Sequence, residues 1–137
     1  MFGEENKYQM KVLSSLEKVF ADEEPIYRPE CVKLSGLWGE TVSYQVAYTG
    51  KHFMRERVDV KVVSPIAEYI RIRTVEEVPV GRATNGIVDD NYLKTTAGLY
   101  PDLLRDLKDN KVIIRSHQWN SLWVDVKLTE DIPVGEY

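Results

Sequence analysis

Apolar and polar residues alternate along several stretches of the chain, with the period of a β-strand that buries one face. The alternation predicts strands at residues 41–48, 57–62, 69–74 and 121–128, with further strands at 9–13 and 111–115. Residues 32–34 are expected to begin a hairpin that turns near Gly36 or Gly39. Most of the regular structure is therefore predicted to be strand.

Helix signals are few. Ser14 and Glu17 have the spacing of a capping box, and Pro25 limits any helix after them to one or two turns. A second short helix is expected at residues 103–107. The rest of residues 81–110 lacks periodicity and is predicted to be a long loop, a feature that is often functional or packed against another body.

Short strands separated by turn signals, without amphipathic helices between them, favour an antiparallel sheet over a parallel one. We therefore predict an all-β fold, a two-sheet antiparallel β-sandwich of immunoglobulin-like or jelly-roll-like type. It should carry one long irregular loop and one or two short helical turns. The 137 residues suit a single domain. Because residues 132–137 directly follow a strand and a turn, we expect an N-terminal fragment of a longer chain.

The composition is that of a folded globular protein, with 43% hydrophobic and 29% charged residues. A net charge of −4 gives no general attraction for nucleic acid or anionic membranes, which bind best to a basic stripe. Cys31 is the only cysteine, so no internal disulfide forms and a reducing compartment is expected. No segment is apolar enough to span a membrane or act as a signal peptide. The cytoplasm is expected if Met1 is the native start; a chain trimmed of its signal would look the same.

A search for catalytic groups predicts no catalytic, cofactor or metal site. The chain has no glycine-rich phosphate loop, and His52 and His117 lack the spacing of a metal pair. Cys31 is interpreted as a packing residue beside a strand. Glycosidases need two carboxylates in distinct environments, but Asp22-Glu23-Glu24 and Asp89-Asp90 are interpreted as solvated loop charges.

The tryptophans carry a more specific signal. Trp123 falls on the polar face of its predicted strand, with Ser121 and Asp125, and Trp119 has the same parity. Three interpretations remain open for Trp123: the long loop covers it as core, it packs against another domain, or it stacks on a sugar ring.

Several segments resemble the N-terminal domain of glycoside hydrolase family 123-like proteins, in conserved order along most of the chain. They are residues 14–20, 39–46, Asn91-Tyr92-Leu93, 98–104, 118–126 and 132–137. The resemblance implies a β-sandwich followed by a (β/α)-barrel that removes terminal N-acetylgalactosamine by substrate-assisted catalysis. The family's adjacent Asp-Glu pair belongs to the barrel. Asp22-Glu23 has the same order but lies in a loop, and it is assigned no catalytic role.

Our first hypothesis is a non-catalytic accessory domain of a glycoside hydrolase that packs against its own C-terminal barrel. The contact is expected at residues 86–104 and at the face that bears Gln45 and Trp123. The alternative is a carbohydrate-binding module that stacks aromatic rings on glycan. Neither needs a cofactor, and an uncovered apolar surface would allow weak self-association. The candidate interface or sugar-stacking residues are Trp123, Trp119, Gln45, Leu99, Tyr100, Pro101 and Asp102.

Overall fold

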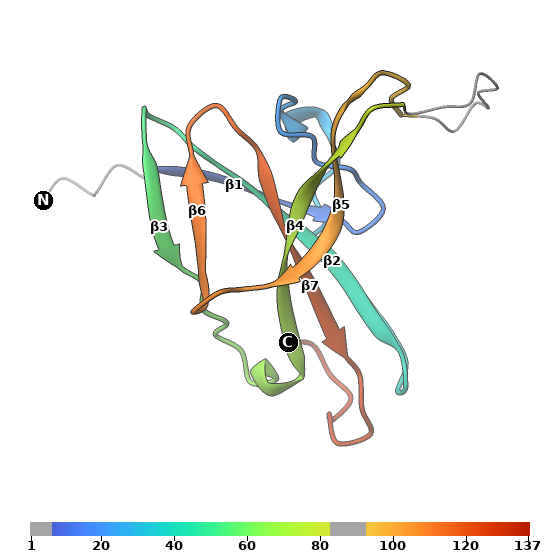
Figure 1. Cartoon of the computed structure of the whole chain (residues 1–137). Coiled ribbons are helices and arrows are strands. Elements are labelled where there is room, and N and C mark those ends of the chain that lie inside the picture. Colours follow the sequence, from blue (N-terminus) through green and yellow to red (C-terminus); the bar gives the residue numbers. More distant parts are fainter. Residues whose placement is uncertain (1–6, 83–92) are drawn as a thin grey trace, which may run out of the picture.

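In the part of the chain that the structure describes, seven strands form two antiparallel sheets (Figure 1). The computed structural model describes residues 7–82 and 93–137. The larger sheet has the order β1-β2-β7-β4-β5 and the smaller one pairs β3 with β6. The strands are β1 (Tyr8–Ser14), β2 (Thr41–Gly50), β3 (Arg55–Asp59), β4 (Ile70–Val80), β5 (Gly98–Asp106), β6 (Lys111–Arg115) and β7 (Asn120–Lys127). The predicted all-β, two-sheet antiparallel sandwich is confirmed.

The alternating pattern sets the register of the central strands. In the β2–β7 pair, Tyr44 lies opposite Val124 and Val46 opposite Leu122, so the apolar positions share one face. The strands predicted at 9–13, 41–48, 111–115 and 121–128 are confirmed, with ends that differ by one or two residues.

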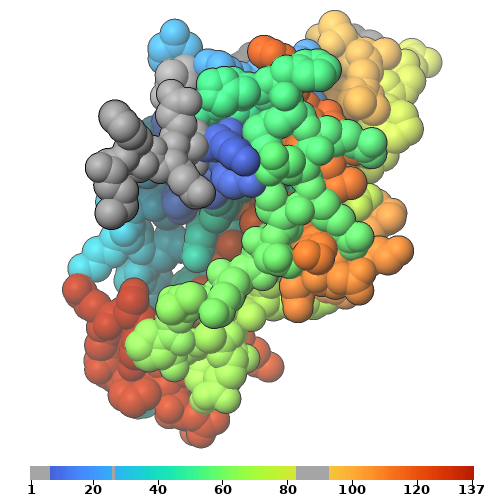
Figure 2. All heavy atoms as spheres, turned by 90° about the vertical axis from the view of Figure 1, so that its left-hand side faces the viewer, coloured from blue at the N-terminus to red at the C-terminus, as the bar shows by residue number. Residues whose placement is uncertain are grey.

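A core fills the space between the two sheets. Its buried residues are Tyr48, Val112, Ile114 and Leu122, with partly buried side chains such as Val58 packed around them. Figure 2 shows this side of the molecule, where the green chain around β3 covers the larger sheet.

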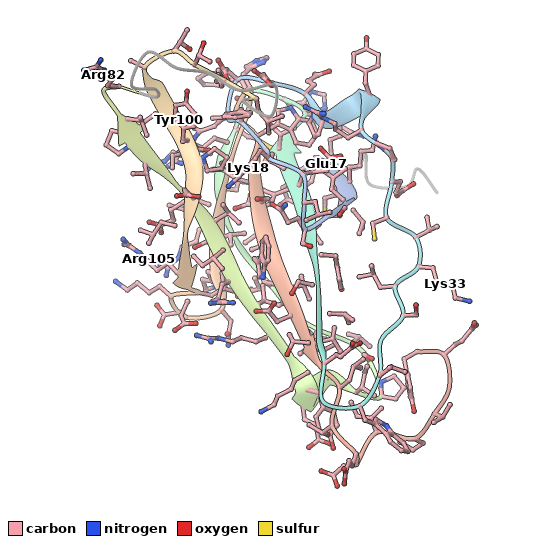
Figure 3. The ribbon with its side chains drawn as sticks, turned by 90° about the vertical axis from the view of Figure 1, so that its right-hand side faces the viewer. Glu17, Lys18, Lys33, Arg82, Tyr100 and Arg105 are labelled. Carbon is pink, nitrogen blue, oxygen red and sulfur yellow. The ribbon has the colours of Figure 1, made fainter. Side chains whose placement is uncertain are left out.

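A second core lies on the opposite face of the larger sheet. It consists of Leu13, Val19, Ala47 and Trp119, and Val19 belongs to the segment at residues 15–24 that crosses the upper part of this face. Each face of the sheet therefore has its own cover, and Figure 3 shows Glu17 and Lys18 of the 15–24 segment over the upper part of this face.

Strand β5 corrects the prediction of a loop with a short helix at residues 103–107. Among the described strands it pairs with β4 alone, at an edge of the sheet. An edge strand tolerates Pro101, whose missing N–H would break a central ladder. Because only one of its edges is paired and many of its side chains are exposed, its sequence carries little alternation. Asp89-Asp90 and the rest of residues 83–92 of the predicted loop lie outside the described residues.

The helix expected after Ser14 is a turn. The Ser14 hydroxyl oxygen accepts from the N–H of Leu16, and its carbonyl accepts from the N–H of Glu17. A serine with this spacing satisfies a turn as readily as a helix start. The helical turns are instead two 3-10 turns, η1 (Pro25–Tyr27) and η2 (Ala67–Tyr69). No helix among residues 7–82 and 93–137 has the length and apolar character to cross a membrane.

Three smaller predictions are also corrected. Residues 32–34 form no strand; Val32 is exposed, and Cys31 donates its N–H to the Val12 carbonyl of β1. The chain does turn at Gly39, whose φ of 90° suits glycine. Strand β3 begins at Arg55 and ends at Asp59, whereas 57–62 was predicted; Val60 still packs against the core and donates its N–H to the Asn110 carbonyl. Strand β4 extends beyond the predicted 69–74.

Candidate functional site

Four predicted residues meet in one hollow on the face of the larger sheet that the smaller sheet does not cover. The hollow has a volume of about 190 Å³, and we call it the Trp123 hollow. Trp123, Gln45 and Val75 form its floor on the central strands, and its lining also includes Lys18, Pro101 and Asp102. Figure 3 shows Lys18 over this face, between Glu17 and Tyr100.

A wider opening of about 450 Å³ lies on the other side of Lys18. It is lined by loop residues such as Glu23, Tyr27 and Arg28 and contains none of the predicted residues. Its lining residues belong to the segment at residues 18–28, which contains no strand. The Trp123 hollow is the better candidate because strands hold its floor in place.

Gln45 fastens the turn at residues 14–17 to the sheet. Its Nε2 donates to the backbone carbonyls of Ser14 and Ser15, both at 3.3 Å, and of Glu17 at 2.6 Å. Its Oε1 accepts from the Ser121 hydroxyl at 3.1 Å. With 3% of its surface exposed, Gln45 has no donor left for a partner molecule. Gln45 therefore offers no exposed polar group for the predicted contact with another domain.

A β-bulge places Asp102 on the wall of the hollow. Glu76 lies opposite Leu103 and Glu77 opposite Pro101, so Asp102 is the extra residue of β5. Neighbouring residues of a regular strand point to opposite faces, whereas a bulge redirects a side chain. Pro101 and Asp102 consequently line the same hollow.

Lys18 closes the hollow on the side of the 15–24 segment. Its Nζ donates to the Pro101 carbonyl and to Asp102 Oδ1, both at 3.2 Å. The side chains of Lys18 and Asp102 are 46% and 72% exposed, so this ion pair contributes little to stability. The ammonium and the carboxylate therefore remain available to a ligand.

Trp123 is half-buried, and a hydrogen-bond network fixes its ring. Its Nε1 donates to Asp125 Oδ1 at 2.8 Å, and Ser43 and Arg73 also donate to the Asp125 carboxylate. Burial alone raises the pKa of Asp125, but hydrogen bonds from Ser43, Trp123 and Arg73, with the Arg73 charge, outweigh it and hold that pKa below its ordinary value. Asp125 is thus an ionised anchor for the indole.

The remaining predicted residues lie outside the hollow. Trp119 is 5% exposed in the second core and offers no face to a sugar. Leu99 is 53% exposed on β5. Tyr100 contacts Phe20 edge-to-face, with ring centroids 5.8 Å apart, and its hydroxyl donates to the Thr96 carbonyl.

The acidic loop residues form ion pairs near Lys94. The ammonium of Lys94 lies 3.5 Å from Asp22 and 3.4 Å from Glu23. Glu77 lies close enough to sense these charges: burial first, then the Asp22 carboxylate, raise its pKa, while Lys94 lowers it. A carboxyl with a raised pKa beside a second carboxylate is a feature of acid catalysts. Glu77 and Asp22 do not line the Trp123 hollow.

Metal ligands do not gather in the part of the chain that the structure describes. No group of three or more His, Cys, Asp or Glu residues there could hold a metal ion. His117 adopts a positive φ of 58°, in the turn before β7.

Sequence reasoning missed six lining residues of the hollow, which are Ser15, Glu17, Lys18, Val19, Val75 and Leu104. Lys18 was placed in an expected helix, and Leu104 in a segment expected to be loop and helix. Val75 lies one residue beyond the predicted strand and has the parity of Arg71 and Arg73, the predicted polar face, so the alternation gave no signal for it.

Comparisons with known proteins give a likeness of fold. No protein-family model and no curated protein sequence matches the chain. Among solved structures, it is similar to a family 123 glycoside hydrolase from Clostridium perfringens, described for its hydrolysis of glycolipid glycans. The TM-score is 0.60 at 12% sequence identity, and the match covers 93% of this chain. It covers 22% of that chain, so this sequence has the extent of one part of the larger enzyme.

Because Gln45 holds the 14–17 turn to the sheet, replacing it with a side chain of the same shape but different hydrogen bonding should lower the stability of the fold. Gln45→Glu places a second acceptor oxygen against three carbonyls, so we expect a loss of about 2–3 kcal/mol in the free energy of unfolding at neutral pH. Urea denaturation followed by tryptophan fluorescence measures it. Ser121→Ala removes only the bond to Oε1 and should cost about 1 kcal/mol. Equal, small losses in both variants would show that Gln45 does not hold the turn.

The lowered pKa of Asp125 predicts a pH dependence of stability. Because its folded pKa is depressed, the ionised group stabilises the fold above its ordinary value of 3.8, and this stabilisation is lost as pH falls through the folded value. Asp125→Asn should cost about 1–2 kcal/mol at neutral pH. The difference from wild type should shrink in acid. Glu130→Gln, at an exposed site, corrects for net charge. A difference that is constant down to the lowest pH at which both proteins fold would contradict the assignment.

Proposed function

We propose that this chain is a non-catalytic β-sandwich domain of a larger glycoside hydrolase, where it packs against the catalytic domain. The observation that carries this proposal is the extent of the match, which takes in nearly all of this chain and 22% of a family 123 glycoside hydrolase. The hydrolytic residues of such a protein would lie in the part that this chain does not cover. The resemblance of residues 98–104 and 118–126 to the same family supports a parent that acts on N-acetylgalactosaminides.

An exposed apolar surface supports packing against a second domain. We call it the terminal surface; it consists of Val32, Leu34, Leu37, Trp38, Val134 and Tyr137, all of them exposed. A bond from Trp38 Nε1 to the Ile132 carbonyl and an ion pair between Lys33 and Glu136 join its two segments. Lys33 marks its outer loop in Figure 3. Exposed apolar clusters of this kind mark interaction sites in soluble proteins.

The contact expected at residues 86–104 remains part of the proposal at Leu99, whose side chain is exposed. The terminal surface is the stronger candidate because its six exposed apolar side chains belong to two segments that a hydrogen bond and an ion pair join. Burial of Trp38, which is 56% exposed, would place a large aromatic ring at the contact, where such rings often contribute most binding energy.

Activity measurements test the proposed role. The purified chain should fold, as judged by far-UV circular dichroism, and should release no nitrophenol from nitrophenyl N-acetylhexosaminides. A longer protein encoded by the same reading frame should release it. Turnover by this chain alone would overturn the proposal, as would a stop codon directly after Tyr137.

The interface is tested in the longer protein with Trp38→Glu. A buried charge at the contact should loosen the two domains, so we expect a second thermal transition or a Tm lowered by several degrees. Phe53→Glu is the matched control, because Phe53 is a fully exposed aromatic residue outside the terminal surface. Equal effects of the two substitutions would place the contact elsewhere.

A further inference from the structure

We propose that the Trp123 hollow binds one neutral pyranose ring. Packing against a catalytic domain requires no ligand, so this inference goes beyond the accessory role. It follows from three independent features of the hollow: its floor, its rim and its charge.

The floor presents a fixed aromatic ring. Trp123 donates its only polar hydrogen to Asp125, which leaves the apolar ring surface for a ligand. Arg73 and Ser43 hold Asp125 in turn, so the indole is oriented before any ligand arrives. One face of a pyranose carries mainly C–H groups, which pack well on an indole. Pro101 and Val75 extend this apolar lining.

The rim provides a donor and an acceptor close together. Lys18 Nζ and Asp102 Oδ1 lie 3.2 Å apart at the mouth, and both side chains are solvated. Adjacent hydroxyls of a sugar each donate and accept hydrogen bonds, so they can bridge an ammonium and a carboxylate. The bulge that turns Asp102 toward the hollow supports this role, because bulges often redirect side chains at binding sites.

Size and charge limit the ligand. The volume of about 190 Å³ corresponds to roughly six liquid waters, below the roughly 300–1,000 Å³ of pockets for drug-sized ligands. One ring fits better than an oligosaccharide. Among the residues that line the hollow, Glu17 and Asp102 are acidic and Lys18 is basic, which disfavours an anionic sugar.

The test is a titration of the chain with neutral methyl pyranosides of glucose, galactose and mannose, followed by amide chemical shifts. We expect saturable shifts at Lys18, Asp102 and Trp123 for at least one sugar, with a Kd on the order of 1 mM for so few contacts. A methyl glucuronide should bind more weakly. Absence of saturable shifts for all three neutral sugars would overturn the proposal.

Variants assign the binding to this hollow. Trp123→Ala should weaken binding by about tenfold or more, and Asp102→Ala by several-fold, whereas Trp38→Ala should leave it unchanged. Trp38 is the matched control because it is an exposed tryptophan of the terminal surface. If Trp123→Ala fails to fold, Asp102→Ala and Lys18→Ala carry the test, because both side chains are largely exposed. Unchanged affinity in these variants would contradict the site, as would a side chain of a neighbouring domain that fills the hollow in the longer protein.

Discussion

The attachment of the 14–17 turn to the sheet through Gln45 is the constraint on which the rest of this face depends. Gln45 lies on a central strand, and its amide joins three carbonyls of the turn to the Ser121 hydroxyl on β7. This bond set holds the 15–24 segment over the sheet, which buries Val19 with Leu13 and leaves the Trp123 hollow beside it. One buried amide therefore determines both the second core and the shape of the candidate site. Such a network is stable only if all its members are satisfied, which makes the face sensitive to small polar changes.

The sequence predicts those strands that have one apolar, buried face and one polar face. Strands β2 and β7 were found because their apolar residues face the core between the sheets while polar residues alternate with them. Strand β5 was missed because an edge strand with Pro101 has neither the alternation nor the composition of a central strand. The turn at Ser14 was interpreted as a helix because the same hydroxyl-to-backbone bond serves both structures. The local sequence pattern identifies a strand that buries only one of its faces. It fails where contacts with distant parts of the chain determine the structure.

The candidate site likewise contains some residues that the sequence pattern identifies and others that only the folded chain brings together. The alternation along the strands puts Trp123 and Gln45 on one face of the sheet, and in the structure the two residues lie opposite each other. The alternation does not show that another segment of the chain buries Gln45 and leaves Trp123 half-buried. Asp102 was named from a resemblance, and its position depends on a bulge that no spacing rule reveals. Lys18 lies 84 residues from Asp102 in sequence, so only the folded chain brings the pair together. The likeness to a glycoside hydrolase gives the fold a context, and the contacts of the hollow give it a distinct chemistry.

The irregular edge strand β5 of the larger sheet also affects how copies of the protein associate with one another. An open strand edge can recruit the same strand from another molecule and start aggregation. On β5 the proline removes one N–H and the extra residue at Asp102 breaks the regular spacing of the others, so a second copy would find no continuous ladder to extend. The feature that shapes the hollow thus also protects this edge against polymerisation.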